Sequence, residues 1–137
     1  MSSRRRAREV VLQLLFQRDL NPEIDLENEE RFLRKRLRQK QPFIDFAEML
    51  LVGIEQRREK IDERLQATAE NWNLSRMAVT DRSILRMGAF EIEFADTPGR
   101  VAINEAIELA KRYGTNNSSQ FVNGILDRLL NSVGESD

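Results

Sequence analysis

Apolar side chains recur at three- and four-residue spacing along almost the whole chain. Up to about residue 20, one such stripe consists of Ala7, Val10, Val11, Leu14 and Leu15, which is typical of one face of an amphipathic helix. Similar patterns predict helices at about 29–38, 42–57, 59–74, 79–95, 101–114 and from about 117 onward. No segment has the alternation of a strand, so we predict an all-α fold with about seven helices.

Glycine and proline mark the expected ends and contacts of these helices. Gly114 follows Lys111 and Arg112, so we expect it to end its helix as a left-handed C-terminal cap. Gly88 lies within the most apolar segment, where close helix packing would compensate for its poor helix propensity. Gly124, also within a predicted helix, suggests close packing or a contact for the same reason. We expect Trp72 and Leu74 to anchor the turn that follows the predicted helix at 59–74.

The residue inventory argues against catalysis. The chain has 137 residues with no histidine and no cysteine, which removes the commonest general base, disulfides and thiolate metal ligands. Carboxylate pairs such as Glu105 and Glu108 lie one helical turn apart, where solvated ion pairs explain them. No phosphate-binding loop or nucleophile motif is present. We therefore expect no enzyme activity, no cofactor and no metal site. The chain lacks a long apolar run, so we expect a cytoplasmic protein without membrane contact.

Charge is segregated along the chain, although the net charge is only −1. Residues 4–8 contain four arginines, residues 19–30 contain six acids, and residues 31–40 contain six bases. On a helix, Arg4, Arg5 and Arg8 fall within an arc of roughly 100° beside the apolar stripe, whereas Arg6 points elsewhere. Guanidinium groups suit phosphate, so the arc is a candidate phosphate-binding surface. The second basic run has a simpler explanation, because the acids before it can pair with it.

Small polar residues precede the last predicted helix, in the sequence GTNNSSQF at positions 114–121. Asn117 and Gln120 fit a capping box, but a cap accounts for only those two residues. A helix N-terminus with free N–H groups is also a natural phosphate site. Phe121 is either a core residue or a stacking platform for an unpaired base, and periodicity alone favours the core.

Four blocks of sequence, in this order and with these separations, resemble the NusB family of bacterial transcription antitermination factors. They are RRRAREVVLQLLFQ near the start, DRSILRMGAFEI at 81–92, VAINEAIELAKRYG at 101–114 and FVNGILDRL at 121–129. The resemblance implies a single domain, residues 1–137, made of two packed helical subdomains at about 1–75 and 76–134. It also implies binding of boxA-type single-stranded RNA from ribosomal RNA operons, together with the ribosomal protein NusE, within an RNA polymerase antitermination complex.

The resemblance also implies site residues. The arginine-rich start corresponds to Arg4, Arg5, Arg6 and Arg8, and the polar segment corresponds to Asn117, Ser118 and Phe121, so base contact is now favoured for Phe121. The NusE-binding face corresponds to Phe16, Asp81 and Arg82. Contacts within 19–75 cannot be carried over, because this region departs most from the family. Asn116 and Asn117 replace an acid that is frequent in the family, which would favour RNA binding.

Two alternatives remain beside this interpretation. One is a non-catalytic targeting domain related to those of RNA cytosine methyltransferases, which use the same helical fold. The chain reaches Asp137 without a catalytic domain, which favours the antitermination factor. The other is a homodimer, formed through the apolar face that would otherwise bind NusE.

Overall fold

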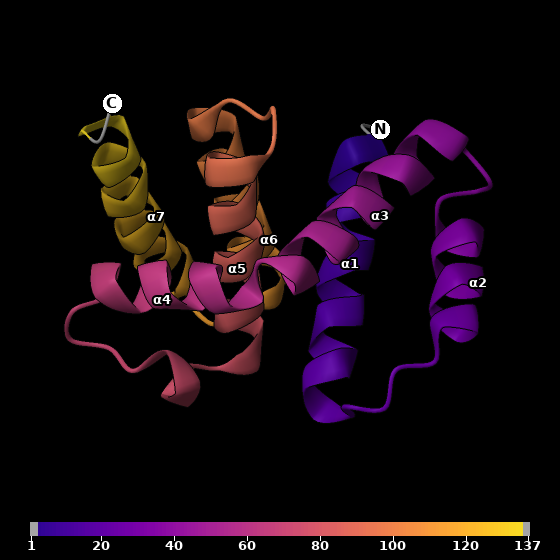
Figure 1. The fold of residues 1–137 in the computed structure, drawn as a ribbon, viewed down its shortest axis with the longest axis horizontal. Coiled ribbons are helices and arrows are strands. Elements are labelled where there is room, and N and C mark those ends of the chain that lie inside the picture. The colour runs from indigo at the N-terminus through magenta and orange to yellow at the C-terminus, as the bar shows by residue number, and fades with distance from the viewer. Residues whose placement is uncertain (1–2, 136–137) are drawn as a thin grey trace. The chain divides into compact units, whose positions relative to one another are not determined.

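The computed structural model describes residues 3–135, and all regular structure in this range is helical. The helices are α1 (Ser3–Leu20), α2 (Leu26–Arg36), α3 (Gln41–Gln56), α4 (Arg58–Thr68), α5 (Val79–Phe94), α6 (Gly99–Tyr113) and α7 (Ser118–Glu135), with one 3-10 turn, η1 (Leu74–Arg76), between α4 and α5 (Figure 1). The prediction of an all-α fold is confirmed. None of the helices in residues 3–135 is long and apolar enough to cross a membrane.

Two compact units make up the chain. The first extends to Gly53, near the end of α3, and the second begins at Ile54. We call them the N-terminal unit and the C-terminal unit. The boundary lies earlier than the division expected near residue 75, because α4 packs against α5 and α7 and so belongs to the second unit.

The N-terminal unit contains α1, α2 and most of α3. The predicted stripe of α1 is buried at Ala7, Val10, Val11 and Leu14. Arg18 near the end of α1 forms a bidentate ion pair with Glu29 of α2, at 2.9 Å from Nε and 2.6 Å from Nη2. Paired, coplanar N–H donors make such contacts specific in geometry.

Helix α2 begins at Leu26, three residues before its predicted start. The Asp25 side chain accepts a hydrogen bond from the Asn28 N–H and thereby caps it. One turn into the helix, Glu30 pairs with Arg34 at 2.9 Å. Part of the basic run is therefore paired with the acids before it, as the charge pattern suggested.

The turn after α2 is a Schellman motif without glycine. The Arg38 N–H donates to the Lys35 carbonyl and the Gln39 N–H donates to the Arg34 carbonyl. Arg38 and Gln39 have φ angles of 53° and 58°, in the left-handed region that costs a residue with a Cβ roughly 1–2 kcal/mol.

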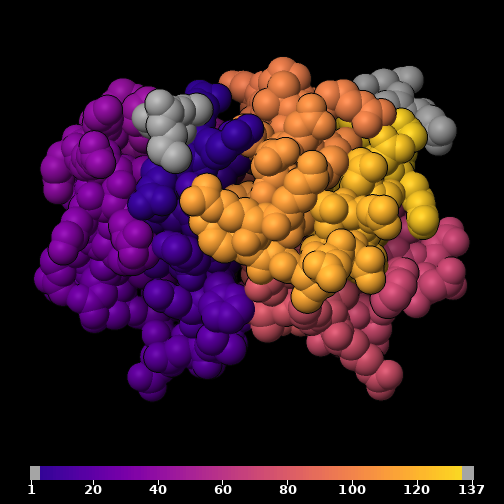
Figure 2. All heavy atoms as spheres, turned by 180° about the vertical axis from the view of Figure 1, so that it is seen from behind, coloured from indigo at the N-terminus to yellow at the C-terminus, as the bar shows by residue number. Residues whose placement is uncertain are grey.

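The C-terminal unit is built around α5. Its residues from Ser83 to Glu91 are all buried, which confirms that the most apolar helix is central. Helix α4 runs across the direction of α5 and α7 in Figure 1 and packs against both. Helices α6 and α7, orange and yellow in Figure 2, pack against each other and against α5.

Glycines on other elements allow close contacts with α7. A Cβ on Gly88 would lie 2.5 Å from Cδ1 of Leu126, and a Cβ on Gly99 would lie 2.5 Å from Cδ1 of Leu130. Close packing at Gly88 is therefore as expected. At Gly124 the expectation of close packing is wrong, because a Cβ there would meet no atom within 4 Å.

We expect Gly88→Ala to lower the free energy of unfolding by about 1–2 kcal/mol. Leu126 is fully buried, so it must shift within a packed core, and overpacking of this kind typically costs about 1–3 kcal/mol. The gain in helix propensity, at most about 1 kcal/mol, offsets only part of this cost. Urea denaturation followed by circular dichroism measures the change.

Gly124→Ala is the matched control, because it has the same gain in propensity and no steric contact. We expect it to stabilise the protein by up to about 1 kcal/mol. Equal stabilisation by Gly88→Ala and Gly124→Ala would contradict the prediction, because it would show that Leu126 can move aside without loss of stability.

Candidate nucleic-acid interface

A hollow of about 840 Å³ opens on the surface of the C-terminal unit. Its lining combines the aromatic rings of Trp72 and Phe121, the cation of Arg76, the carboxylate of Asp81, and four side-chain amides, Asn71, Asn73, Asn117 and Gln120. The hollow thus draws on three parts of the chain: the segment around η1, the start of α5 and the start of α7.

The start of α7 forms one wall and is held by a hydroxyl. Ser118 is buried, and its Oγ accepts a hydrogen bond from the Thr115 N–H at 2.9 Å and lies 3.2 Å from the Thr115 hydroxyl. Among the sequence-predicted residues, Ser118 therefore orders the turn, whereas Asn117 lies exposed on the lining.

Gly114 ends α6 in a different conformation from the one expected. Its φ of −92° and ψ of −165° are extended, so the prediction of a left-handed cap is wrong. A Cβ at this position would lie 2.5 Å from both Cβ and Oγ of Ser118, and 2.8 Å from the Ala110 carbonyl oxygen. Glycine is required because α6 and α7 approach closely here, and not because of backbone handedness.

Trp72 also lines the hollow, and its ring contacts Phe121 edge to face. The ring centroids are 5.1 Å apart and the interplanar angle is 78°, an arrangement that aromatic pairs favour. Leu74 is buried and anchors the turn as predicted, but Trp72 is 58% exposed. Trp72, which was also expected to anchor the turn, is held through its backbone and its contact with Phe121, and not by burial of its side chain. Phe121 is partly buried, so it belongs both to the core edge and to the hollow.

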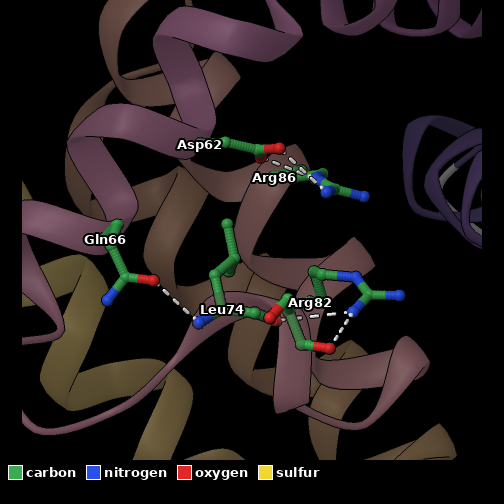
Figure 3. Close-up of polar contacts among 6 residues, drawn as sticks. Asp62, Gln66, Leu74, Arg82 and Arg86 are labelled. Carbon is green, nitrogen blue, oxygen red and sulfur yellow. Dashed lines mark hydrogen bonds and ion pairs between the residues drawn. The ribbon is translucent and has the colours of Figure 1, made fainter.

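Side chains of α4 and α5 hold the segment around η1 in place (Figure 3). Gln66 accepts at Oε1 from the Leu74 N–H at 2.9 Å. It also donates from Nε2 to the Trp72 carbonyl at 2.6 Å. Arg82 donates from Nη1 to the carbonyls of Leu74 and Ser75, at 3.4 and 3.2 Å. The backbone beside Trp72 is therefore held by long side chains from neighbouring helices.

The three residues predicted to bind a protein partner are divided between the two units and have different environments. Asp81 lines the hollow, as Phe121 and Asn117 do. The guanidinium of Arg82 supports η1. Phe16 belongs to the N-terminal unit, where it is 37% exposed.

The four predicted arginines have different environments within α1. Arg4 and Arg8 both lie over the ring of Phe46, with Cζ at 4.6 and 5.0 Å from the ring centroid. Arg4 and Arg5 are exposed, but only 4% of Arg8 is exposed. Arg6 is half-buried and lies 3.6 Å from the buried Glu9. The structure therefore presents Arg4 and Arg5 to solvent, and Arg8 packs beside its apolar neighbours.

Sequence reasoning did not identify Trp72, Arg76 and the amides of Asn71 and Asn73 as part of a site. The only local signal was NWN at positions 71–73, where two amides flank an aromatic residue. Within residues 3–135, no group of three or more acidic side chains is placed to hold a metal ion.

The family model for NusB matches residues 5–131 of the chain. The chain belongs to the NusB family. It is 47% identical over 137 residues to the transcription antitermination protein NusB of Desulfitobacterium hafniense, with coverage of 98% of this chain and 93% of that protein.

Solved NusB structures share the fold. NusB of T. maritima superimposes with a TM-score of 0.83 at 39% identity, covering 93% of this chain and 90% of that one. A crystal structure of the antitermination factors NusB and NusE in complex with double-stranded RNA gives a TM-score of 0.79 at 21% identity, covering 96% and 98% of the two chains.

We expect Gly114→Ala to disrupt the start of α7. The added methyl group must displace Ser118 or the end of α6, which would lower the free energy of unfolding by about 1–3 kcal/mol. It would also weaken the bond from the Thr115 N–H to the Ser118 hydroxyl. Hydrogen exchange at the Thr115 amide, measured by NMR, should become faster than in the wild type. Unchanged exchange and unchanged stability would contradict the steric role of Gly114.

Proposed function

We propose that this chain is a non-enzymatic, cytoplasmic transcription antitermination factor that binds boxA-type single-stranded RNA of ribosomal RNA operons together with NusE, within an RNA polymerase antitermination complex. Membership of the NusB family supports this proposal. The protein with the same fold that was solved with NusE and double-stranded RNA supports the choice of partners. The observation that carries the proposal is the hollow, because it brings Asn117, Ser118 and Phe121 together with a second aromatic ring.

RNA recognition has chemical requirements that these residues meet. Sequence-specific proteins read unpaired bases through aromatic stacking and hydrogen bonds to base edges, and the hollow offers both rings and amides. Exposed arginines at the start of α1 suit phosphate oxygens. We assign phosphate contact to Arg4 and Arg5, and we give Arg8 a packing role against Phe46.

Contact with NusE is assigned first to Phe16, an exposed aromatic residue late in α1. Asp81 and Arg82 remain candidates for the same contact. Arg82 would act there by positioning η1, since its guanidinium already binds two carbonyls of that turn.

Fluorescence anisotropy with a short boxA-type RNA, with and without NusE, tests the proposed function. We expect binding that strengthens with NusE, and we expect Arg5→Ala and Phe121→Ala each to weaken it several-fold. Each phosphate contact makes the slope of log affinity against log salt more negative by about 0.7, so the slope in Arg5→Ala should be about 0.7 less steep than in the wild type. Arg31→Ala, which removes an exposed arginine from α2, is the matched control and should bind normally.

Absence of RNA binding, with and without NusE, would contradict the proposed function. Light scattering of the same samples distinguishes a complex with NusE from self-association of this chain.

Asn117→Asp should weaken RNA binding, because it places a carboxylate on the lining of the hollow. A new repulsion from one phosphate is worth up to about 1 kcal/mol in water at close range, or about five-fold in affinity. Screening should reduce this difference as salt is raised. Asn131→Asp makes the same change at an exposed position later in α7 and should leave RNA affinity unchanged. Equal affinity of Asn117→Asp and wild type at low salt would contradict the prediction.

A further inference from the structure

Trp72 is the only tryptophan of the chain, and more than half of its surface is exposed beside the hollow. Large aromatic rings are usually buried to a much greater extent. Its ring contacts Phe121 edge to face, and its exposed side chain lines the hollow. The question is why the fold holds this ring in a position where it is not covered.

The backbone of Trp72 is fixed on both sides of the residue. Its N–H donates to the Ala69 carbonyl at 2.9 Å, and its carbonyl accepts from Gln66 at 2.6 Å. One residue further on, the Asn73 side chain accepts from both the N–H and the hydroxyl of Ser75, at 3.0 and 2.7 Å. An ordered backbone with an exposed ring is the arrangement that a stacking platform needs, because little conformational entropy is lost on binding.

The other residues of the lining indicate what kind of group would occupy the hollow. A flat heterocycle can stack on an aromatic ring and present its edge to amides, which both donate and accept hydrogen bonds. Asp81 disfavours a phosphate inside the hollow, whereas Arg76 favours one nearby. The volume of about 840 Å³ is within the range of roughly 300–1,000 Å³ that is usual for small-ligand sites.

We propose that the hollow receives one unpaired base of the bound RNA, stacked on Trp72 beside Phe121, with its edge facing Asn73 and Asn117 and its phosphate near Arg76. The proposal rests on the proposed function and adds a stacking residue and a defined occupant to it. Aromatic stacking contributes a sequence-tolerant part of the affinity for single strands, so the flanking amides would supply the discrimination between bases.

The emission of Trp72 reports directly on this contact. RNA labelled at one end is titrated with the protein, and RNA anisotropy and tryptophan emission are recorded on the same samples. A series of boxA-type RNAs, each with a single abasic site at a different position, locates the base. The difference in emission between wild type and Trp72→Phe isolates the signal of Trp72 when NusE is present.

We expect intact RNA to quench Trp72. Only the RNA whose abasic site replaces the stacked base should fail to quench Trp72. That RNA should bind the wild type about ten-fold more weakly than intact RNA does. Trp72→Ala should weaken binding of intact RNA by a similar factor, and it should bind that abasic RNA as tightly as the wild type does. Trp72→Phe, which keeps a stacking ring, should retain most of the affinity. Trp72 is exposed and its anchoring bonds involve only its backbone, so circular dichroism should show that these variants fold.

RNA binding without quenching, or with quenching that no single abasic site removes, would overturn the base pocket and leave the proposed function intact. Quenching by NusE in the absence of RNA would also overturn it, by showing that the hollow accommodates the protein partner. Absence of any RNA binding would contradict the proposed function and the base pocket together.

Discussion

The close approach of α7 to its neighbours determines the architecture of the C-terminal unit. Gly88 of α5, Gly99 of α6 and Gly114 at the end of α6 each bring a backbone against α7, where an added Cβ would lie 2.5 Å from a side-chain atom. These contacts are distributed from the first turn of α7 to its later part. Phe121 lies in the first turn, so its position beside Trp72 follows from how closely the helices pack.

Much of the fold was predictable because it depends on local pattern. Helix number and the central position of α5 follow from spacing of apolar residues, which reports which face of a helix is buried. Helix ends depend on individual hydrogen bonds, and there the prediction was weaker. Asp25 starts α2 three residues early, and α4 ends at Thr68 because the segment after it is held by Gln66 instead of continuing the helix.

The site was predictable only in part, because its geometry depends on contacts between distant residues. Helical periodicity correctly places Arg4 and Arg8 together, but it cannot reveal that Phe46 lies beneath both, or that Arg8 is buried there. The polar segment before α7 was identified from composition. Trp72 was expected to anchor a turn, and nothing local in the sequence indicates that more than half of this large aromatic residue is exposed.

The turn after α2 has a consequence for how this sequence can diverge. Arg38 and Gln39 occupy left-handed backbone where glycine or asparagine would be less strained. Gly114 occupies extended backbone that any residue adopts, yet its surroundings admit no Cβ. Replacement of Arg38 or Gln39 by glycine or asparagine during evolution would therefore raise the stability of the protein. Replacement of Gly114 by any other residue would lower it. At Gly88, Gly99 and Gly114, glycine is therefore explained by a closely packed neighbouring side chain and not by an unusual backbone angle.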